Sequence, residues 1–169
     1  MCGIAGKFDL ENRSSPDLLK AMCSSMAHRG PDDEGTFSSG GMDLAHRRLS
    51  ILDLSAAGHQ PMSTRDGKLT IVYNGEVYNF EQIRAELERL GHSFGSRTDT
   101  EVVLNAFRQW GPKCLDRFAG MFGLAIWDAT EQTLFIARDR LGIKPIYYPL
   151  ANEGFPRTTG KNGLPPWVF

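Results

Sequence analysis

Strand-like and helix-like segments do not alternate regularly along this 169-residue chain. Two pairs of strand-like runs are neighbours in sequence, residues 36–38 with 42–47 and residues 121–127 with 133–137. Gly40-Gly41 separates the first pair and a polar turn separates the second. Strands joined by short turns pair antiparallel, whereas a doubly wound parallel sheet needs a helix between successive strands. The order of segments therefore predicts an α+β fold, in which helices pack on antiparallel sheets.

Three segments repeat apolar residues at helical spacing, and they cover residues 16–26, 80–90 and 99–110. Ser15 and Asn79 are the expected caps of the first two helices, and residues 98–101 (TDTE) form a capping-box pattern before the third. Further strands are expected at residues 4–8, 69–73 and 143–148. Asn74-Gly75 reads as a tight turn that ends the second of these strands.

Composition narrows the class of protein. An apolar content of 41% suits one compact domain with its own core. The net charge of -1 provides no basic surface for a phosphate backbone, so nucleic acid is not an expected partner. The longest apolar stretch, residues 119–127, is far shorter than the roughly 20 residues that cross a bilayer, so no membrane contact is expected. The N-terminus lacks the regions of a signal peptide, and a cytoplasmic location is the default expectation.

Cysteine and histidine spacing predicts no metal site and no disulfide framework. The three cysteines, Cys2, Cys23 and Cys114, are far apart, and the four histidines do not form closely spaced ligand pairs. Cys23 and Cys114 lie in segments with helical or apolar patterning and are expected in the core. Cys2 differs because of its place in the chain.

Cys2 directly follows Met1, and removal of Met1 would give Cys2 a free α-amine beside its thiol. An α-amine titrates at roughly pH 8, so part of it is neutral near neutral pH and can take the thiol proton during attack. One residue would then supply both nucleophile and base. Position alone favours the plainer interpretation, in which Cys2 is an ordinary residue after the start of the chain.

A series of motifs gives Cys2 a context. In chain order they are CGIAG at 2–6, HRGPD at 28–32, RLSILD at 48–53, QP at 60–61, NGEVYN at 74–79, TDTE at 98–101, GMF at 120–122 and RDRLGIKP at 138–145. The series resembles the glutaminase domain of class II glutamine amidotransferases, and specifically the asparagine-synthetase branch. The sister branches that aminate sugar phosphates share the opening motif and usually lack the HRGPD and NGEVYN wording.

The resemblance implies a fold and an activity for residues 1–148. The fold is a four-layer α/β/β/α sandwich of the N-terminal-nucleophile hydrolase type, with Cys2 at the end of the first strand between the sheets. The activity is hydrolysis of the glutamine side-chain amide to glutamate and ammonia. In this branch of amino-acid biosynthesis, a glutaminase supplies the ammonia for asparagine synthase. L-Glutamine is then the small-molecule partner.

The resemblance also assigns roles to individual residues. Cys2 is the nucleophile, and the Asn74 side-chain amide with the Gly75 backbone N–H forms the oxyanion hole. Arg48 matches the group that binds the substrate carboxylate, while Glu76 and Asp99 match those that bind its ammonium. Backbone groups of Leu49, Ser50, Ile51 and Leu52 are implied to line the glutamine pocket. Arg29 and Asp32 are implied to organise the loop over the site.

Each of these residues has a plainer interpretation. Asn74-Gly75 is also a common turn sequence, and Arg48 fits a polar strand edge formed with His46 and Arg47. Asp99 suits the first turn of a helix, where an acidic residue complements the helix dipole. Glu76 fits a surface charge. The motif context favours the functional roles.

The chain lacks the Ser- and Gly-rich pyrophosphate loop of a synthetase domain. No cofactor is expected for the glutaminase domain, and ATP and Mg would be needed only where a separate synthetase domain or chain is present. Residues 149–169 hold four of the nine prolines and read as an irregular tail, where the family has a further strand. The tail suggests a truncation, with an inactive remnant or a glutamine-binding module as the alternative function.

Overall fold

The computed structural model describes residues 1–9, 16–51 and 53–147. The strands are β1 (Gly3–Phe8), β2 (Asp33–Ser39), β3 (Met42–Arg48), β4 (Met62–Ser63), β5 (Leu69–Val77), β6 (Gly120–Asp128) and β7 (Thr133–Arg138). The α-helices are α1 (Pro16–Ser25), α2 (Phe80–Arg89) and α3 (Asp99–Trp110). Short 3-10 helices are η1 (Ala27–Arg29), η2 (Ala56–Gly58) and η3 (Gly111–Arg117).

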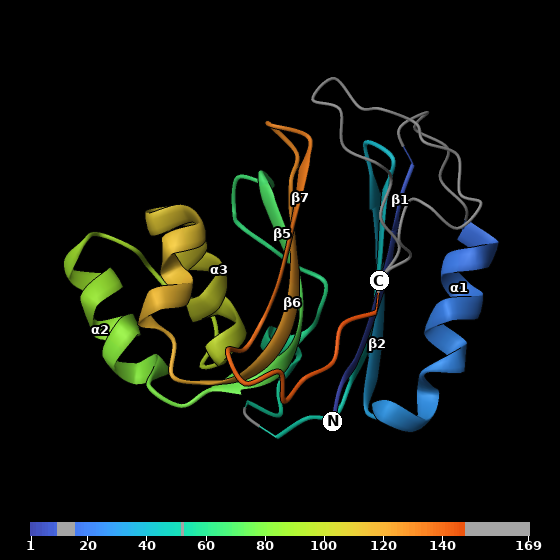
Figure 1. Cartoon of the computed structure of the whole chain (residues 1–169), viewed down its shortest axis with the longest axis horizontal. Coiled ribbons are helices and arrows are strands. Elements are labelled where there is room, and N and C mark those ends of the chain that lie inside the picture. The colour runs from blue at the N-terminus through green and yellow to red at the C-terminus, as the bar shows by residue number, and fades with distance from the viewer. Residues whose placement is uncertain (10–15, 52, 148–169) are drawn as a thin grey trace.

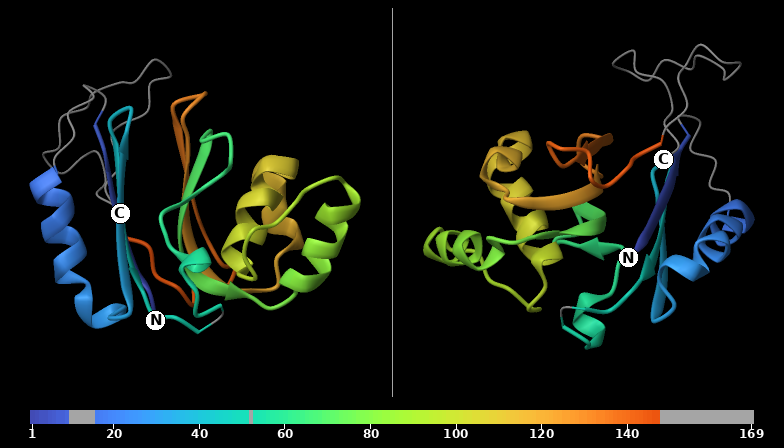
Figure 2. Two further views of the ribbon diagram at one scale, coloured as in Figure 1. Left: turned by 180° about the vertical axis from the view of Figure 1, so that it is seen from behind. Right: turned by 60° about the horizontal axis from the view of Figure 1, so that its bottom comes forward.

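Two antiparallel sheets face each other, with the strand orders β1-β3-β2 and β4-β5-β6-β7. Helix α1 covers the outer face of the first sheet, and α2 and α3 cover the outer face of the second (Figure 1). The views of Figure 2 show the same order of layers from behind and from below. The predicted α+β fold and the four-layer α/β/β/α sandwich are therefore confirmed.

Each of the three interfaces between layers has its own apolar cluster. Leu19, Cys23 and Ala45 belong to the cluster between α1 and the first sheet. Met42, Leu44, Val72, Ala125 and Trp127 fill the space between the two sheets. The largest cluster joins the second sheet to α2 and α3, and it includes Ile71, Leu87, Leu104 and Cys114. Burial of this apolar surface is what holds the four layers together.

The expected hairpins are present. The β2–β3 hairpin turns at Gly40 and Gly41, both of which have positive φ, at 57° and 79°. Two central residues with positive φ match the twist of paired strands and favour glycine. The second hairpin joins β6 to β7. No helix among the described residues is long and apolar enough to cross a membrane.

The prediction of a turn at Asn74-Gly75 is wrong, because both residues lie inside β5 and pair with Gly123 and Phe122 of β6. The glycine is needed for close approach rather than for a turn. A Cβ on Gly75 would lie 2.4 Å from the Met121 carbonyl oxygen and 2.5 Å from the Phe122 Cα. An Asn-Gly sequence therefore fits a tight turn and also a strand that lies unusually close to its paired neighbour.

The predicted strand at residues 143–148 is also wrong over its described part, since residues 143–147 follow β7 without strand pairing. Tyr148 and the tail at 149–169 lie outside the described residues, as does the expected cap Ser15. Asn79 precedes α2 without capping it, and its side chain instead bonds the Arg117 carbonyl and the Ala119 N–H.

Only half of the capping box before α3 forms as expected. The Thr98 hydroxyl accepts the Glu101 N–H at 3.3 Å. The Glu101 carboxylate turns instead to the Gly95 and Ser96 N–H groups and to the Ser96 hydroxyl. The loop before α3 is therefore tied to the first turn of the helix.

The segment after β7 is held by the carboxylate of Asp139, which is buried. Its oxygens accept the N–H groups of Phe122, Ile143 and Lys144 at 3.2, 2.9 and 2.9 Å. Burial raises the pKa of Asp139, but these backbone donors outweigh that effect and hold its pKa below the ordinary value. One carboxylate thus fixes the turn that leads Lys144 back toward the N-terminus.

We expect Asp139→Ala to lower the free energy of unfolding by about 3 kcal/mol, because it leaves several buried N–H groups without their charged acceptor. Urea denaturation measures the change, with the exposed Asp116→Ala as the matched control. A loss within roughly 0.5 kcal/mol, the range of ordinary surface substitutions, would contradict the anchoring role.

Candidate active site

Cys2 lies just before β1, where the first sheet opens toward the second. Its sulfur is 3.4 Å from the Leu49 nitrogen and 3.8 Å from the Leu49 oxygen, so the residue after β3 contacts the thiol through its backbone. Arg29 donates to the Cys2 carbonyl at 3.4 Å. The Asp32 carboxylate accepts the Ser50 N–H at 2.7 Å and holds the loop after β3. Arg29 and Asp32 thus have the supporting positions that the motif implied.

The thiol lies at a cavity of about 110 Å³ between the two sheets and the start of α3. Most of the predicted site residues line it, namely Cys2, Arg48, Leu49, Ile51, Asn74, Gly75, Glu76 and Asp99. Ser50 does not line the cavity. Leu52 lies outside the described residues. Four separate stretches of sequence therefore meet at one small space.

The pairing of β5 determines where the Gly75 N–H points. Both the N–H and the carbonyl of Phe122, which is opposite Gly75, are bonded to Asp139 on the far side of β6. Paired residues of an antiparallel ladder either bond each other or both face away. The Gly75 N–H therefore faces away from β6, as do the N–H groups of Tyr73 and Val77 two residues before and after it.

The partners of those two neighbouring N–H groups confirm this direction. Tyr73 donates to Gln60 Oε1 at 2.7 Å, and Val77 donates to Asp99 Oδ2 at 3.0 Å. Gln60, Gly75 and Asp99 all line the cavity. The Gly75 N–H is thus aimed into the cavity between two acceptors that the fold already uses, as an oxyanion donor requires.

Asp99 is the first residue of α3, but its carboxylate reaches across to β5. Oδ2 accepts the Tyr73 hydroxyl at 2.7 Å as well as the Val77 N–H. Burial, with only 5% of the residue exposed, raises the pKa of this carboxyl group despite those donors. Asp99 is therefore more than a solvated acid at a helix N-terminus, since its contacts place it inside the cavity wall.

Arg48 is buried, and its guanidinium donates to the Ser55 carbonyl at 3.0 Å and to the Asp53 carbonyl. Gly58 allows this packing, because a Cβ there would lie 2.0 Å from Nη2. The Asp53 carboxylate in turn accepts the Arg97 N–H at 3.0 Å. The polar-edge interpretation of Arg48 is wrong, and the loop around residues 53–58 holds the guanidinium at the cavity.

Several residues that line the cavity were not predicted as site residues from the sequence. They are Met1, Gly58, Gln60, Tyr73, Thr98, Thr100, Met121 and Lys144. Lys144 is buried, and its Nζ lies 2.8 Å from the Met1 sulfur. Gln60 belongs to the QP motif, which pointed to the family without indicating a role. Their contacts depend on chain segments far apart in sequence, so local patterns could not reveal them.

The other cysteines and the histidines do not line this cavity. Cys23 and Cys114 are free and buried, as predicted. His46 is fully buried between the sheets, so the polar-edge interpretation is wrong for this residue too. Within residues 1–9, 16–51 and 53–147, no group of three or more His, Cys, Asp or Glu side chains is placed to hold a metal ion.

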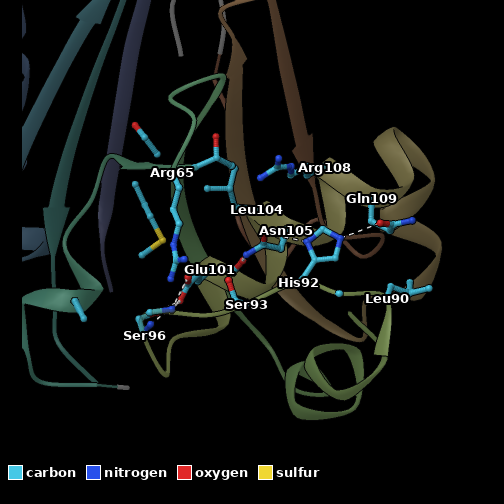
Figure 3. Close-up of a pocket in the computed structure, with 16 residues that line it drawn as sticks. Arg65, Leu90, His92, Ser93, Ser96, Glu101, Leu104, Asn105, Arg108 and Gln109 are labelled. Atoms are coloured by element: carbon cyan, nitrogen blue, oxygen red, sulfur yellow. Dashed lines mark hydrogen bonds between the residues drawn. The ribbon is translucent and has the colours of Figure 1, made fainter. Parts of the chain in front are cut away.

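A second and larger cavity, of about 620 Å³, lies between the loop that follows β4, the loop that precedes α3, and α3 itself (Figure 3). Arg65, His92, Ser96, Glu101 and Arg108 line it. It contains no thiol and none of the predicted site residues. The larger cavity volume therefore does not mark the candidate active site, which is identified by the position of Cys2 at the smaller cavity.

Comparison with known proteins identifies the family of this chain. A model of the glutamine amidotransferase domain matches residues 1–161. The chain belongs to this family. It is 38% identical over 159 residues to the glutamine-hydrolysing asparagine synthetase 3 of Bacillus subtilis strain 168, covering 92% of this chain and 26% of the relative. Asparagine synthetase B of Escherichia coli strain K12 is 40% identical over 156 residues, covering 91% and 28%. The amidotransferase-family chain thus spans about a quarter of these relatives.

A solved structure supports the fold independently. The glutamine phosphoribosylpyrophosphate amidotransferase of B. subtilis aligns with a TM-score of 0.73 over 99% of this chain and 41% of its own. Its sequence identity is 18%, so the likeness concerns the architecture alone. The sandwich of the amidotransferase domain is therefore shared by chains whose sequences have diverged widely.

His46 predicts a measurable pH dependence of stability. Its Nε2 lies 3.2 Å from the Tyr73 carbonyl, which only accepts, so Nε2 carries the hydrogen and the buried Nδ1 has no partner among the described residues. Burial lowers the pKa of His46 from 6.5 to about 4. Between these two pH values His46 binds a proton in the unfolded chain but not in the folded chain. The free energy of unfolding therefore falls as the pH drops from 6.5 toward 4.

We expect the free energy of unfolding to fall by about 2 kcal/mol over this pH range because of His46 alone. Urea titrations of the unsubstituted chain and of His46→Gln measure the difference, since glutamine retains a donor for the Tyr73 carbonyl and does not titrate. His59→Gln, at a half-exposed site, is the control. Equal pH profiles for the unsubstituted and His46→Gln chains would contradict a neutral buried His46.

Proposed function

We propose that this domain hydrolyses the side-chain amide of L-glutamine and supplies ammonia for asparagine synthesis. The observation that carries the proposal is the meeting of the Cys2 thiol, the Gly75 N–H and the Asp99 carboxylate at one cavity. A nucleophile, a donor for developing negative charge and an anion for a substrate ammonium are the three groups that hydrolysis of an amino-acid amide needs.

Met1 must leave before this site can work. In the structure the Met1 side chain lines the cavity and contacts Lys144, so it occupies space beside the nucleophile. Removal of Met1 opens that space and gives Cys2 the α-amine that serves as its base. The proposal therefore makes processing of the N-terminus a condition for activity.

The ammonium and the carboxylate of glutamine each have a charged binding group in the proposed site. Asp99 and Glu76 receive the ammonium, and an arriving cation relieves the cost of holding the buried Asp99 as an anion. Arg48 receives the carboxylate, and its anchoring by the 53–58 loop keeps the guanidinium oriented for a planar acceptor. Leu49 and Ile51, which line the cavity, complete the proposed wall around the substrate.

The first half-reaction forms a thioester and releases ammonia. The Cys2 sulfur attacks the amide carbon while the α-amine takes the thiol proton. The carbonyl oxygen becomes an oxyanion, which accepts hydrogen bonds from the Gly75 N–H and the Asn74 side-chain amide. The α-ammonium then gives its proton to the leaving nitrogen, the C–N bond breaks, and ammonia departs.

The second half-reaction restores the enzyme. A water molecule loses a proton to the α-amine and attacks the thioester carbon, and the same oxyanion donors hold the new tetrahedral intermediate. The C–S bond breaks, the sulfur recovers the proton from the α-ammonium, and glutamate is released. The chain's own groups supply every proton transfer, so the proposal needs no cofactor for this half of the chemistry.

The ammonia acceptor in the proposal belongs to a synthetase domain or chain that activates aspartate with ATP and Mg. The similarity to glutamine-hydrolysing asparagine synthetases supports this partner. A cytoplasmic location is part of the proposal, because a cysteine nucleophile has to stay reduced.

Intact mass spectrometry of the purified chain, with and without a glutamine-analogue electrophile, tests the proposal. We expect loss of Met1 and one adduct, mapped to Cys2, because Cys2 is the thiol at the cavity while Cys23 and Cys114 are buried. Excess glutamine should slow the labelling at least about tenfold by occupying the same cavity, and Cys2→Ser should remain unlabelled.

Two outcomes would contradict the proposal. One is a chain that keeps Met1 quantitatively, and the other is labelling of Cys2 that glutamine does not slow. A coupled assay for glutamate on the same preparation distinguishes hydrolysis from binding alone. γ-Glutamyl peptides tested beside glutamine would reveal a different amide substrate.

A further inference from the structure

We propose that Gln60 is a positioning residue that sets the separation between the oxyanion donor on β5 and the ammonium-binding carboxylate on α3. The inference rests on the proposed function, because it concerns how the two ends of glutamine are held. Gln60 is 96% covered by the fold, with a relative exposure of 4%, and it lines the same cavity as Cys2.

The side-chain amide of Gln60 bridges the two elements that carry the site. Its Oε1 accepts the Tyr73 N–H of β5 at 2.7 Å, and its Nε2 donates to the Thr100 hydroxyl of α3 at 3.2 Å. Tyr73 is two residues before Gly75, and Thr100 directly follows Asp99. Gln60 therefore touches the neighbours of both functional groups while its own contacts are with protein.

The short length of β4 explains why a side chain, and not a strand backbone, bonds the Tyr73 N–H. Strand β4 pairs Met62 with Ile71 and Ser63 with Thr70, and the same register would put Gln60 opposite Tyr73. Strand β4 begins at Met62, however, so the backbone pairing stops before it reaches Gln60. The Gln60 amide reaches the Tyr73 N–H in place of a strand and leaves the next outward N–H, that of Gly75, facing the cavity.

Asp99 provides a second connection between β5 and α3. Its carboxylate accepts the Tyr73 hydroxyl at 2.7 Å, while Gln60 holds the Tyr73 backbone and the residue after Asp99. Two independent bridges thus connect β5 to the first turn of α3. Their combined effect is to hold Asp99 and the Gly75 N–H at a constant separation, which glutamine must span.

Glutamine is suited to this bridge because one amide both accepts and donates. Methionine has a similar length but removes both hydrogen bonds and leaves the buried Tyr73 N–H without its acceptor. Thr100→Val removes only the α3 end of the bridge, and Thr100→Ser keeps it. These variants separate the bridge from the general need for a filled interior.

The test is a calorimetric titration of glutamine into the full chain carrying Cys2→Ala, which binds without consuming the substrate. We expect Gln60→Met and Thr100→Val to raise the Kd for glutamine about tenfold each, and the pair together to have little more effect than either alone. Thr100→Ser should retain the Kd of the Cys2→Ala parent.

Thr70→Val is the matched control. It removes a buried hydroxyl of the same strand, which lies 2.8 Å from the Ser63 hydroxyl and away from the cavity. We expect it to lower thermal stability while leaving the Kd within about twofold. An equal rise of the Kd in Thr70→Val would show a general effect of destabilisation and overturn the inference, as would an unchanged Kd in Gln60→Met or Thr100→Val.

The titration also separates this inference from the proposed hydrolysis. If Cys2→Ala binds glutamine but the unsubstituted chain does not hydrolyse it, the hydrolysis proposal fails and the Gln60 prediction still stands or falls on the measured Kd values. If the Cys2→Ala parent does not bind glutamine, the substrate assignment and the role of Gln60 are both overturned.

Discussion

The outward edge of β5 imposes the constraint on which the site depends. A buried backbone N–H must find an acceptor or lose free energy, and β4 is too short to cover this edge. The fold satisfies the N–H of Tyr73 with Gln60 and that of Val77 with Asp99. Between them, the Gly75 N–H faces the cavity. The need to satisfy the backbone N–H groups of an exposed strand edge thus leaves one of them, that of Gly75, available as a hydrogen-bond donor in the cavity.

The layered architecture explains why this donor meets a cysteine at the start of the chain. Strand β1 is an edge strand of the first sheet, and Cys2 precedes it where the two sheets face each other. The end of β3 brings Leu49 and Arg48 to the same place. Each interface between layers has its own apolar cluster, and the charged groups of the cavity lie outside these clusters.

Two buried carboxylates of this fold have pKa values that are shifted in opposite directions. Asp99 is held by donors from β5 and retains a raised pKa because those donors do not fully replace water. Asp139 has a lowered pKa because backbone N–H groups surround its carboxylate. In the proposed function a substrate cation stabilises the first carboxylate, whereas the backbone donors already satisfy the second, which fixes the chain.

Local sequence patterns predicted the parts of the fold that local physics determines. The glycine turn of the β2–β3 hairpin and the apolar spacing of α2 and α3 both depend on neighbouring residues, and both predictions hold. The turn prediction at Asn74-Gly75 is wrong because a tight turn and a close approach to a paired strand both favour glycine. The contacts of Gln60 and Lys144 were missed because they arise only when distant segments fold together. Cys2, Gly75 and Asp99, which the motif series named, converge at one cavity, and their roles stay predictions.

The most direct test of the account is a crystal structure of the covalent adduct between Cys2 and a glutamine-analogue ketone electrophile. We expect the ketone oxygen within about 3 Å of the Gly75 nitrogen and the Asn74 side-chain nitrogen, with the ligand ammonium at Asp99. The free α-amine of Cys2 should lie beside the sulfur. An adduct whose oxygen points away from β5, or whose ammonium lies away from Asp99, would contradict the proposed site.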